Sequence, residues 1–215
     1  MSRGAFITLE GIEGAGKSTV AQWLGEWLGA HGLIVRLTRE PGGTELAERV
    51  RRIVLERGRE QVSAQAETLL MFAARAIHLD NLIRPALAAG EWVLSDRFTD
   101  ATRAYQGGGR GVDPQWIDTL AAHVHADLVP TCTLLLDLPV ALGLQRARAR
   151  RGETDRFEAE TEAFFERIRA AYLSLARCEP HRFRIIDASA PVAAVREQVA
   201  AALAPWLESS RGASR

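Results

Sequence analysis

The chain has 215 residues, a length that suits one compact domain. Lys plus Arg and Asp plus Glu number 27 each, so the formal net charge is zero, which argues against a nucleic-acid partner. The two cysteines form neither a metal-ligand pattern nor a disulfide framework, and no apolar run is long enough to cross a membrane. Because the N-terminus also lacks a charged-then-apolar leader, we expect a cytoplasmic protein without a membrane partner.

Strand-like apolar runs alternate with helix-like segments along the chain. The expected strands are 6–10, 34–38, 92–95, 133–137 and 183–187. The expected helices are 17–30, 46–56, 64–89, 114–123, 140–149, 159–178 and 192–207. This alternation predicts one α/β domain over residues 1–215, with a doubly wound five-stranded parallel sheet flanked by helices. Ligands of such sheets bind beyond the carboxyl ends of the strands.

The first expected strand leads directly into a glycine-rich loop and then into a helix. The loop and the helix start comprise Gly11, Ile12, Glu13, Gly14, Ala15, Gly16, Lys17, Ser18 and Thr19. This G-x-x-x-x-G-K-S spacing is typical of the P-loop NTPase fold, in which backbone N–H groups bind phosphate oxygens. Lys17 adds a charge for the outer phosphates, and the Ser18 hydroxyl can ligate Mg²⁺. A plain glycine turn would need neither residue, so we expect a site for ATP and Mg²⁺.

The expected strand at 92–95 ends in a second pair of phosphate-seeking residues, Asp96 and Arg97. If this strand neighbours the first one, Asp96 can hold Mg²⁺ and Arg97 can bind a phosphate on an acceptor. The alternative interpretation is a surface Asp-Arg pair. A second phosphate site favours a kinase over a nucleotide switch or a motor ATPase, because a switch needs no acceptor pocket.

Three further segments fit the same picture. Residues 38–44 close the second expected strand, and Arg51 follows on the next helix. Phe72 and Arg75, three residues apart on the helix at 64–89, can stack on a base and contact its edge. Phe72 alone would more often belong to the core, because an aromatic residue at helical spacing usually packs.

Five arginines lie within eleven residues around Gly152: Arg146, Arg148, Arg150, Arg151 and Arg156. We expect a new helix to begin at Thr154-Asp155, which would place these arginines in a loop between helices. Such a loop, at about 147–157, is predicted to be a mobile lid that neutralises charge on a transferring phosphoryl group. The alternative is a solvated helix end with cations near its C-terminus.

These motifs together resemble those of the thymidylate kinase family, from residue 6 to about residue 190. Four segments carry the resemblance: residues 10–19, 38–44, 96–98 and 104–111 (A-Y-Q-G-G-G-R-G). The family resemblance implies the reaction ATP + dTMP → ADP + dTDP with Mg²⁺, a step toward dTTP, carried out by a homodimer. The nearest alternative is a kinase for another nucleoside monophosphate.

The resemblance also implies roles for individual residues. It implies a metal site at Ser18 and Asp96. The implied catalytic set is Lys17, Asp96, Arg97 and the lid arginines Arg148, Arg150, Arg151 and Arg156. The implied nucleotide site is residues 11–19 with Arg146 on the adenine and Asp187 nearby. The implied dTMP site is Glu10, Glu40, Pro41, Arg51, Met71, Phe72, Arg75, Arg97, Thr102, Tyr105 and Gln106. Within it, Thr102 and Gln106 would bind the base, and Tyr105 would crowd the 2′ position.

Two features place this chain within the family, one that assigns it to a subgroup and one that departs from the common pattern. The phosphate loop carries Glu13, Gly14 and Ala15 and no arginine, so the chain resembles the bacterial subgroup whose charge-stabilising arginine lies in the lid. Many members have a base-stacking Phe four residues before the arginine equivalent to Arg75, one helical turn away. That position is Met71 here, so either Met71 or Phe72 covers the base.

Overall fold

The computed structural model describes residues 4–56, 60–149, 157 and 160–212. The strands are β1 (Phe6–Glu10), β2 (Val35–Arg39), β3 (Trp92–Asp96), β4 (Cys132–Asp137) and β5 (Phe183–Asp187). The helices are α1 (Lys17–Ala30), α2 (Glu45–Leu55), α3 (Ala64–His78), α4 (Arg84–Ala88), α5 (Thr99–Thr102), α6 (Pro114–His125), α7 (Val140–Ala149), α8 (Glu162–Cys178) and α9 (Val192–Gly212). Two π-helical segments are η1 (Leu79–Ile83) and η2 (Arg103–Gly109).

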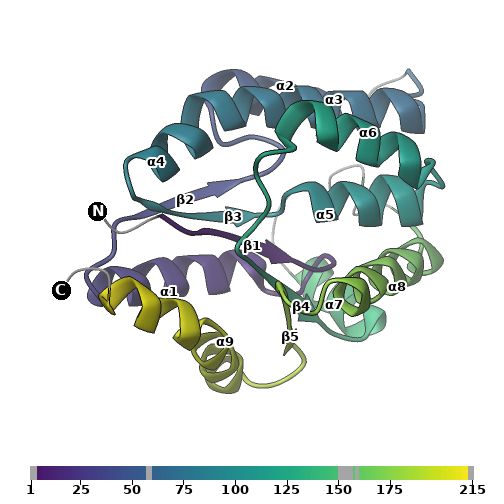
Figure 1. Cartoon of the computed structure of the whole chain (residues 1–215). Helices are drawn as coiled ribbons and strands as arrows, with labels where there is room; N and C mark the ends of the chain where they lie inside the picture. Colours follow the sequence, from purple (N-terminus) through teal and green to yellow (C-terminus); the bar gives the residue numbers. More distant parts are fainter. Residues whose placement is uncertain (1–3, 57–59, 150–156, 158–159, 213–215) are drawn as a thin grey trace.

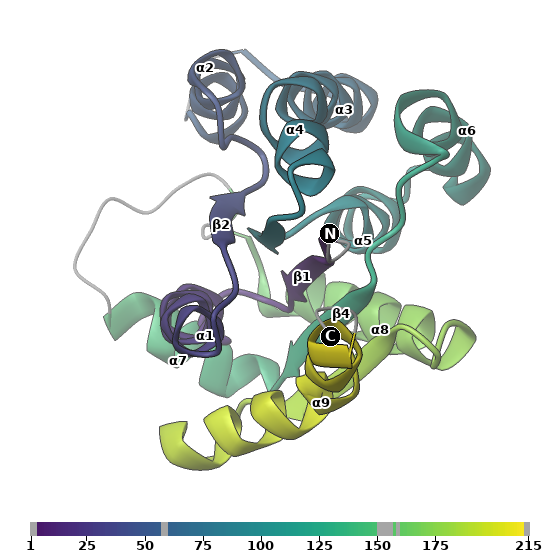
Figure 2. The same cartoon turned by 60° about the vertical axis from the view of Figure 1, so that its left-hand side comes forward.

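The five strands form one parallel sheet in the order β2-β3-β1-β4-β5. Helices cover both faces, with α1 and α9 on one side and α3, α4 and α8 on the other (Figures 1 and 2). The doubly wound five-stranded sheet predicted from the alternating pattern is therefore confirmed. Strand β3 lies between β2 and β1, so the carboxyl ends of these three strands meet at one edge of the sheet.

Alternate residues of the central strands point to opposite faces. Phe6 and Val93, which are register partners, pack in a cluster with the buried residues of η1 and α4. Ile7 and Leu94, the next partners, belong to the larger core that also contains α1 and α9 residues. Both faces of the strands are buried, which is why they read as continuous apolar runs rather than as alternating patterns. Within the described residues, no helix combines the length and apolarity needed to span a bilayer.

Several element boundaries differ from the predicted ones. The expected helix at 64–89 is interrupted by η1, a π-helical segment that joins α3 to α4. The glycine-containing motif at 104–111 lies largely in η2, directly after α5, and neither helix was expected there. The prediction that a helix begins at 159 was wrong, because α8 begins at Glu162 and the Thr161 hydroxyl caps it by accepting from Phe164 N. The predicted start at Thr154-Asp155 lies outside the described residues.

A buried ion pair fixes the start of α5 to the strand pair β4 and β5. Arg182, just before β5, donates to both carboxylate oxygens of Asp100 at 2.7 and 2.9 Å. It also donates to the Thr133 hydroxyl of β4 at 2.8 Å. The side chains of both Arg182 and Asp100 are under 5 % exposed. Since α5 leads into η2, this ion pair anchors the segment that carries Thr102 and Gln106.

Replacing Arg182 with methionine should destabilise the fold by about 3 kcal/mol, because the buried Asp100 carboxylate then loses its bidentate partner. The matched control is Arg36→Met, which breaks the exposed pair of Arg36 with Glu91. It should cost less than about 1 kcal/mol, because exposed ion pairs contribute little. Urea unfolding of both variants measures the difference, and equal losses would contradict the structural role of the buried pair.

Candidate active site

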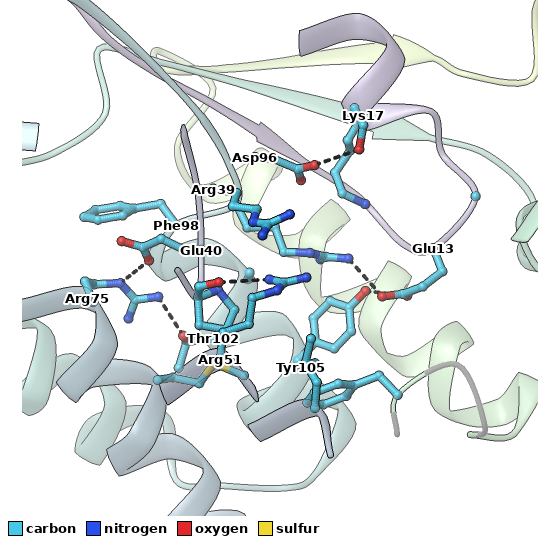
Figure 3. Close-up of a pocket in the computed structure, with 18 of the residues that line it drawn as sticks. Glu13, Lys17, Arg39, Glu40, Arg51, Arg75, Asp96, Phe98, Thr102 and Tyr105 are labelled. Carbon is cyan, nitrogen blue, oxygen red and sulfur yellow. Dashed lines mark hydrogen bonds and ion pairs between the residues drawn. The ribbon is translucent and has the colours of Figure 1, made fainter. Parts of the chain in front are cut away.

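A cavity of about 480 Å³ lies beyond the carboxyl ends of β1, β2 and β3. The expected site residues that line it are Glu13, Gly14, Gly16, Lys17, Ser18, Thr19, Glu40, Pro41, Arg51, Met71, Arg75, Asp96, Arg97, Thr102, Tyr105, Gln106 and Arg146. Those within the described chain that do not line it are Glu10, Gly11, Ile12, Ala15, Phe72, Arg148 and Asp187. Both predicted phosphate sites therefore open into the same cavity (Figure 3).

Two glycines shape the loop between β1 and α1. Gly14 and Gly16 have φ values of 74° and 87°, in the left-handed region that glycine adopts without strain. A Cβ atom at Gly14 would overlap the backbone oxygen of Gly143 in α7. The loop therefore needs glycine at both positions, and it brings the N-terminus of α1 to the cavity, where the helix dipole favours an anion.

Lys17 is the only lysine of the sequence, and every other residue in its count of 27 Lys plus Arg is an arginine. Its Nζ donates to the backbone oxygens of Gly11 and Ile12 at 3.0 and 2.9 Å. Burial, and secondly the positive charge of Arg97, lower the pKa of Lys17 from 10.5 to about 8. A phosphate in the cavity would favour the charged form.

Ser18 and Asp96 place two oxygen ligands side by side. The Ser18 hydroxyl donates to Asp96 Oδ2 at 3.2 Å, and both residues line the cavity. They meet because β3 pairs with β1, with Asp96 opposite Leu9. A hydroxyl and a carboxylate at a phosphate loop suit Mg²⁺, a hard cation that takes oxygen ligands and keeps several waters. The residues present therefore fit a magnesium site shared between the loop and β3.

Arg97 has a positive φ of 77°, which is uncommon for a residue with a side chain. Its Nη2 donates to Glu13 Oε1 at 2.9 Å, and its Nη1 to Gly11 O at 3.2 Å and the Tyr172 hydroxyl at 3.3 Å. The guanidinium lies 4.6 Å from the centre of the Tyr105 ring. Tyr105 in turn donates to Glu13 Oε2 at 2.6 Å. This network fixes a cation between the phosphate loop and the opposite wall.

The opposite wall is built around a buried Arg75 (Figure 3). Its Nε donates to Glu40 Oε2 at 2.7 Å and its Nη2 to the Thr102 hydroxyl at 3.1 Å. Within the described chain, its Nη1 has no hydrogen-bond acceptor. Glu40 also bonds His78 Nδ1 at 3.1 Å. Burial alone would raise the pKa of Glu40, but Arg75 and His78 outweigh it and lower the pKa, so Glu40 balances the charge of Arg75.

Met71 and Phe72, the two candidates for covering the base, occupy different environments. Met71 lines the cavity. Phe72 packs in a separate cluster with Val112, Ile117 and Ala121, and its ring lies under the guanidinium of Arg75. The structure thus places the thioether on the wall and the aromatic ring behind it.

Glu10, expected among the substrate contacts, lies beneath the site rather than on its wall. Its Oε2 accepts from the Tyr172 hydroxyl at 2.7 Å and its Oε1 from Phe98 N at 2.8 Å. Burial first, and the negative charge of Asp100 second, raise the pKa of Glu10 from 4.5 to about 8. By holding Phe98 N and Tyr172, Glu10 supports the backbone and the guanidinium of Arg97 from below.

Of the two residues expected near the adenine, one lines the cavity and the other does not. Arg146 lines the cavity from α7 and donates to Ala188 O at 2.7 Å and Ser189 O at 3.4 Å. Asp187 lies off the wall and holds this loop by accepting from Ser189 N at 2.9 Å. Arg148, near the end of α7, is exposed. The other expected lid arginines, Arg150, Arg151 and Arg156, lie outside the described residues.

Some wall residues were not singled out from the sequence. They are Arg39, Leu55, Phe98, Ala101 and Phe157. Phe157 packs edge-on against Tyr105, with ring centres 5.9 Å apart. Arg39 and Phe98 lie inside the motifs at 38–44 and 96–98, so the signal that could have found them was already in the sequence. Leu55 and Ala101 carry no chemical signal in the sequence, whereas Phe157 is the last residue of the segment predicted to be a lid.

The parallel sheet, the phosphate loop and the facing arginines together define a P-loop nucleotide kinase. Comparison with known proteins narrows this class, because the family model described as "Thymidylate kinase" matches residues 9–199. The chain belongs to the thymidylate kinase family.

Individual relatives agree with the family match. The chain is 56 % identical to a thymidylate kinase of Pseudomonas savastanoi pv. phaseolicola over 209 residues, 97 % of this chain and 99 % of the relative. It is 54 % identical to a thymidylate kinase of Pseudomonas fluorescens, again over 97 % of this chain and 99 % of the relative. It is also similar to the crystal structure of a thymidylate kinase from Ehrlichia chaffeensis, with a TM-score of 0.75 and 33 % identity over 93 % of this chain and 98 % of that one.

The raised pKa of Glu10 predicts a pH-dependent stability. Because the folded state holds this proton more tightly than the unfolded chain, the contribution of Glu10 is fully present below about pH 4.5 and is lost as the pH rises through about 8. The variant Glu10→Gln removes this titration and keeps an acceptor. Its free energy of unfolding relative to the wild type should therefore rise between about pH 5 and about pH 9. Denaturant unfolding across this range measures the difference, and a constant difference would contradict the burial argument.

Proposed function

We propose that the chain transfers the γ-phosphoryl group of ATP to dTMP, giving ADP and dTDP for dTTP synthesis. The observation that carries the proposal is that the phosphate loop and a second cationic wall face one cavity of about 480 Å³. Membership of the thymidylate kinase family supports dTMP as the acceptor. A switch or motor ATPase would have no use for the acceptor wall.

ATP binds at the phosphate loop in this proposal. The backbone of residues 11–19 and Lys17 hold the β- and γ-phosphates, and Arg146, pinned by two backbone oxygens, offers its flat guanidinium to the adenine. Ser18 and Asp96 would hold Mg²⁺. When bound, this ion neutralises charge on the phosphate oxygens.

dTMP binds at the opposite wall. Arg97 and Arg51 contact its phosphate, while Thr102, Gln106 and Arg75 contact the thymine edge. Arg51 is preset by donating to Pro41 O at 2.9 Å. The buried ring of Tyr105 crowds the sugar and disfavours a 2′-hydroxyl. Met71, on the wall between these groups, covers the base.

The transfer is direct and in line. Phosphoryl transfer requires mainly positioning and charge stabilisation from the protein, and the acceptor is already an anionic phosphate at neutral pH. A strong general base is therefore unnecessary, and Asp96 serves the metal and the orientation of the acceptor. The lid arginines Arg148, Arg150, Arg151 and Arg156 supply the charge that the phosphate loop lacks, as in the bacterial lid-arginine subgroup.

The same proposal includes a homodimer and a cytoplasmic location. Leu46 and Ile53 on α2 and Leu69 on α3 are large apolar side chains that are about half exposed on packed neighbouring helices, which supports a self-association face there. Cys132 and the exposed Cys178 are both free thiols, as is usual in a reducing compartment.

An assay of ADP production across dTMP, dUMP, UMP, dCMP and AMP tests the activity. dTMP should give the highest kcat/KM, and the ribonucleotides should be poor substrates because of Tyr105.

The variant Lys17→Ala is the control for chemistry at the phosphate loop. It should lose at least about 100-fold in kcat, because a charge on the transition state is removed. ATP hydrolysis that proceeds equally well without any monophosphate would contradict the proposal.

A further inference from the structure

The amide of Gln106 is held by a buried carboxylate. Its Nε2 donates to Glu67 Oε1 at 2.7 Å, and both side chains are 1 % exposed. A carboxylate offers only acceptors, so the amide must turn its nitrogen toward Glu67. Arg110, whose Nε lies 3.6 Å from Glu67 Oε1, provides positive charge beside the carboxylate. The orientation of the Gln106 amide is therefore fixed by chemistry rather than by packing alone.

The fixed orientation leaves the amide oxygen of Gln106 available. Gln106 lines the cavity, and no group in the described part of the chain donates to its Oε1. The wall at this point therefore presents a hydrogen-bond acceptor.

A hydrogen-bond donor lies on the same wall. Arg75, two helical turns after Glu67 on α3, donates to Thr102, which is four residues before Gln106. Two interactions thus join α3 to the consecutive segments α5 and η2: Arg75 contacts Thr102 of α5, and Glu67 contacts Gln106 of η2. Met71 lies midway along α3 and lines the cavity between them. Arg75 also has a buried Nη1 with no acceptor among the described residues, so the wall that carries the Gln106 acceptor also carries a spare donor.

We propose that Glu67 is a specificity-determining positioning residue, which selects 2,4-dioxopyrimidines over 4-aminopyrimidines by holding the Gln106 amide nitrogen away from the base. The proposal rests on the dTMP kinase function proposed above. Thymine presents a donor, N3–H, beside an acceptor, O4, and matches the Gln106 oxygen and Arg75. Cytosine presents an acceptor, N3, beside a donor, its 4-amino group. An acceptor would then face the Gln106 oxygen and a donor would face Arg75, so neither hydrogen bond could form. Unpaired buried polar groups are costly, which makes this arrangement discriminating.

The variant Glu67→Gln tests the proposal with little change in shape. The new amide can donate or accept, so the Gln106 amide can turn. The kcat/KM for dTMP should fall about 10-fold, mainly through KM, while the KM for ATP stays unchanged. The ratio of kcat/KM for dTMP to that for dCMP should narrow by about the same factor.

Two further variants make the result specific. Glu160→Gln is the same change on the other carboxylate that contacts Arg110, at 2.6 Å, and it should keep the wild-type ratio. The double variant Glu67→Gln with Gln106→Glu exchanges the carboxylate and the amide. A carboxylate at position 106 accepts from the new amide and still presents an acceptor, so the preference for dTMP should return.

The outcomes separate this inference from the proposed function. If the wild type forms dTDP but Glu67→Gln keeps the wild-type ratio, the role of Glu67 is refuted and the function stands. If the wild type forms no dTDP, the proposed function itself fails. If thermal unfolding shows that the single variant does not fold, the exchanged double variant decides, because loss of dTMP preference there refutes the inference and retention supports it.

Discussion

The site depends on the placement of β3 directly beside β1. In this register Asp96 lies opposite Leu9, so the residues after β3 meet the phosphate loop after β1 at the same sheet edge. Parallel strands with crossover helices expose all their carboxyl ends on one side, which makes such a meeting possible. Without this adjacency Ser18 would have no carboxylate neighbour and Arg97 would not reach Glu13. The meeting of the two phosphate-seeking motifs in one cavity follows from that one pairing.

Acidic side chains on or just behind the cavity wall hold the groups that face the ligands. Glu13 binds Arg97, Glu40 binds Arg75, and Glu67 binds the amide of Gln106. All three partners, Arg97, Arg75 and Gln106, also line the cavity, and Arg75 keeps an Nη1 that has no acceptor among the described residues. This arrangement keeps cationic and polar groups in place before a ligand arrives, so less ordering is needed on binding. The low exposure of these pairs strengthens their electrostatic interactions.

Local pattern predicted the fold, and it predicted that two short motifs meet at one sheet edge, because each motif depends on a short segment. The phosphate loop and the Asp96 motif contain their own chemistry, and alternating strands and helices fix the edge where they meet. Long-range packing was not predictable in this way. Nothing near Glu10 in the sequence signals that Tyr172 of α8 lies over it. The pairing of Glu67 with Gln106 joins residues 39 apart, and the outward turn of Met71 depends on how α3 packs. These features require the tertiary structure.

The central claim is that donor and acceptor occupy one cavity at the same time and react directly. Initial rates measured over a matrix of ATP and dTMP concentrations test this most simply. Direct transfer requires a ternary complex, so double-reciprocal plots should give lines that intersect. Parallel lines, the pattern of a covalent phosphoenzyme that releases ADP before dTMP binds, would contradict the account.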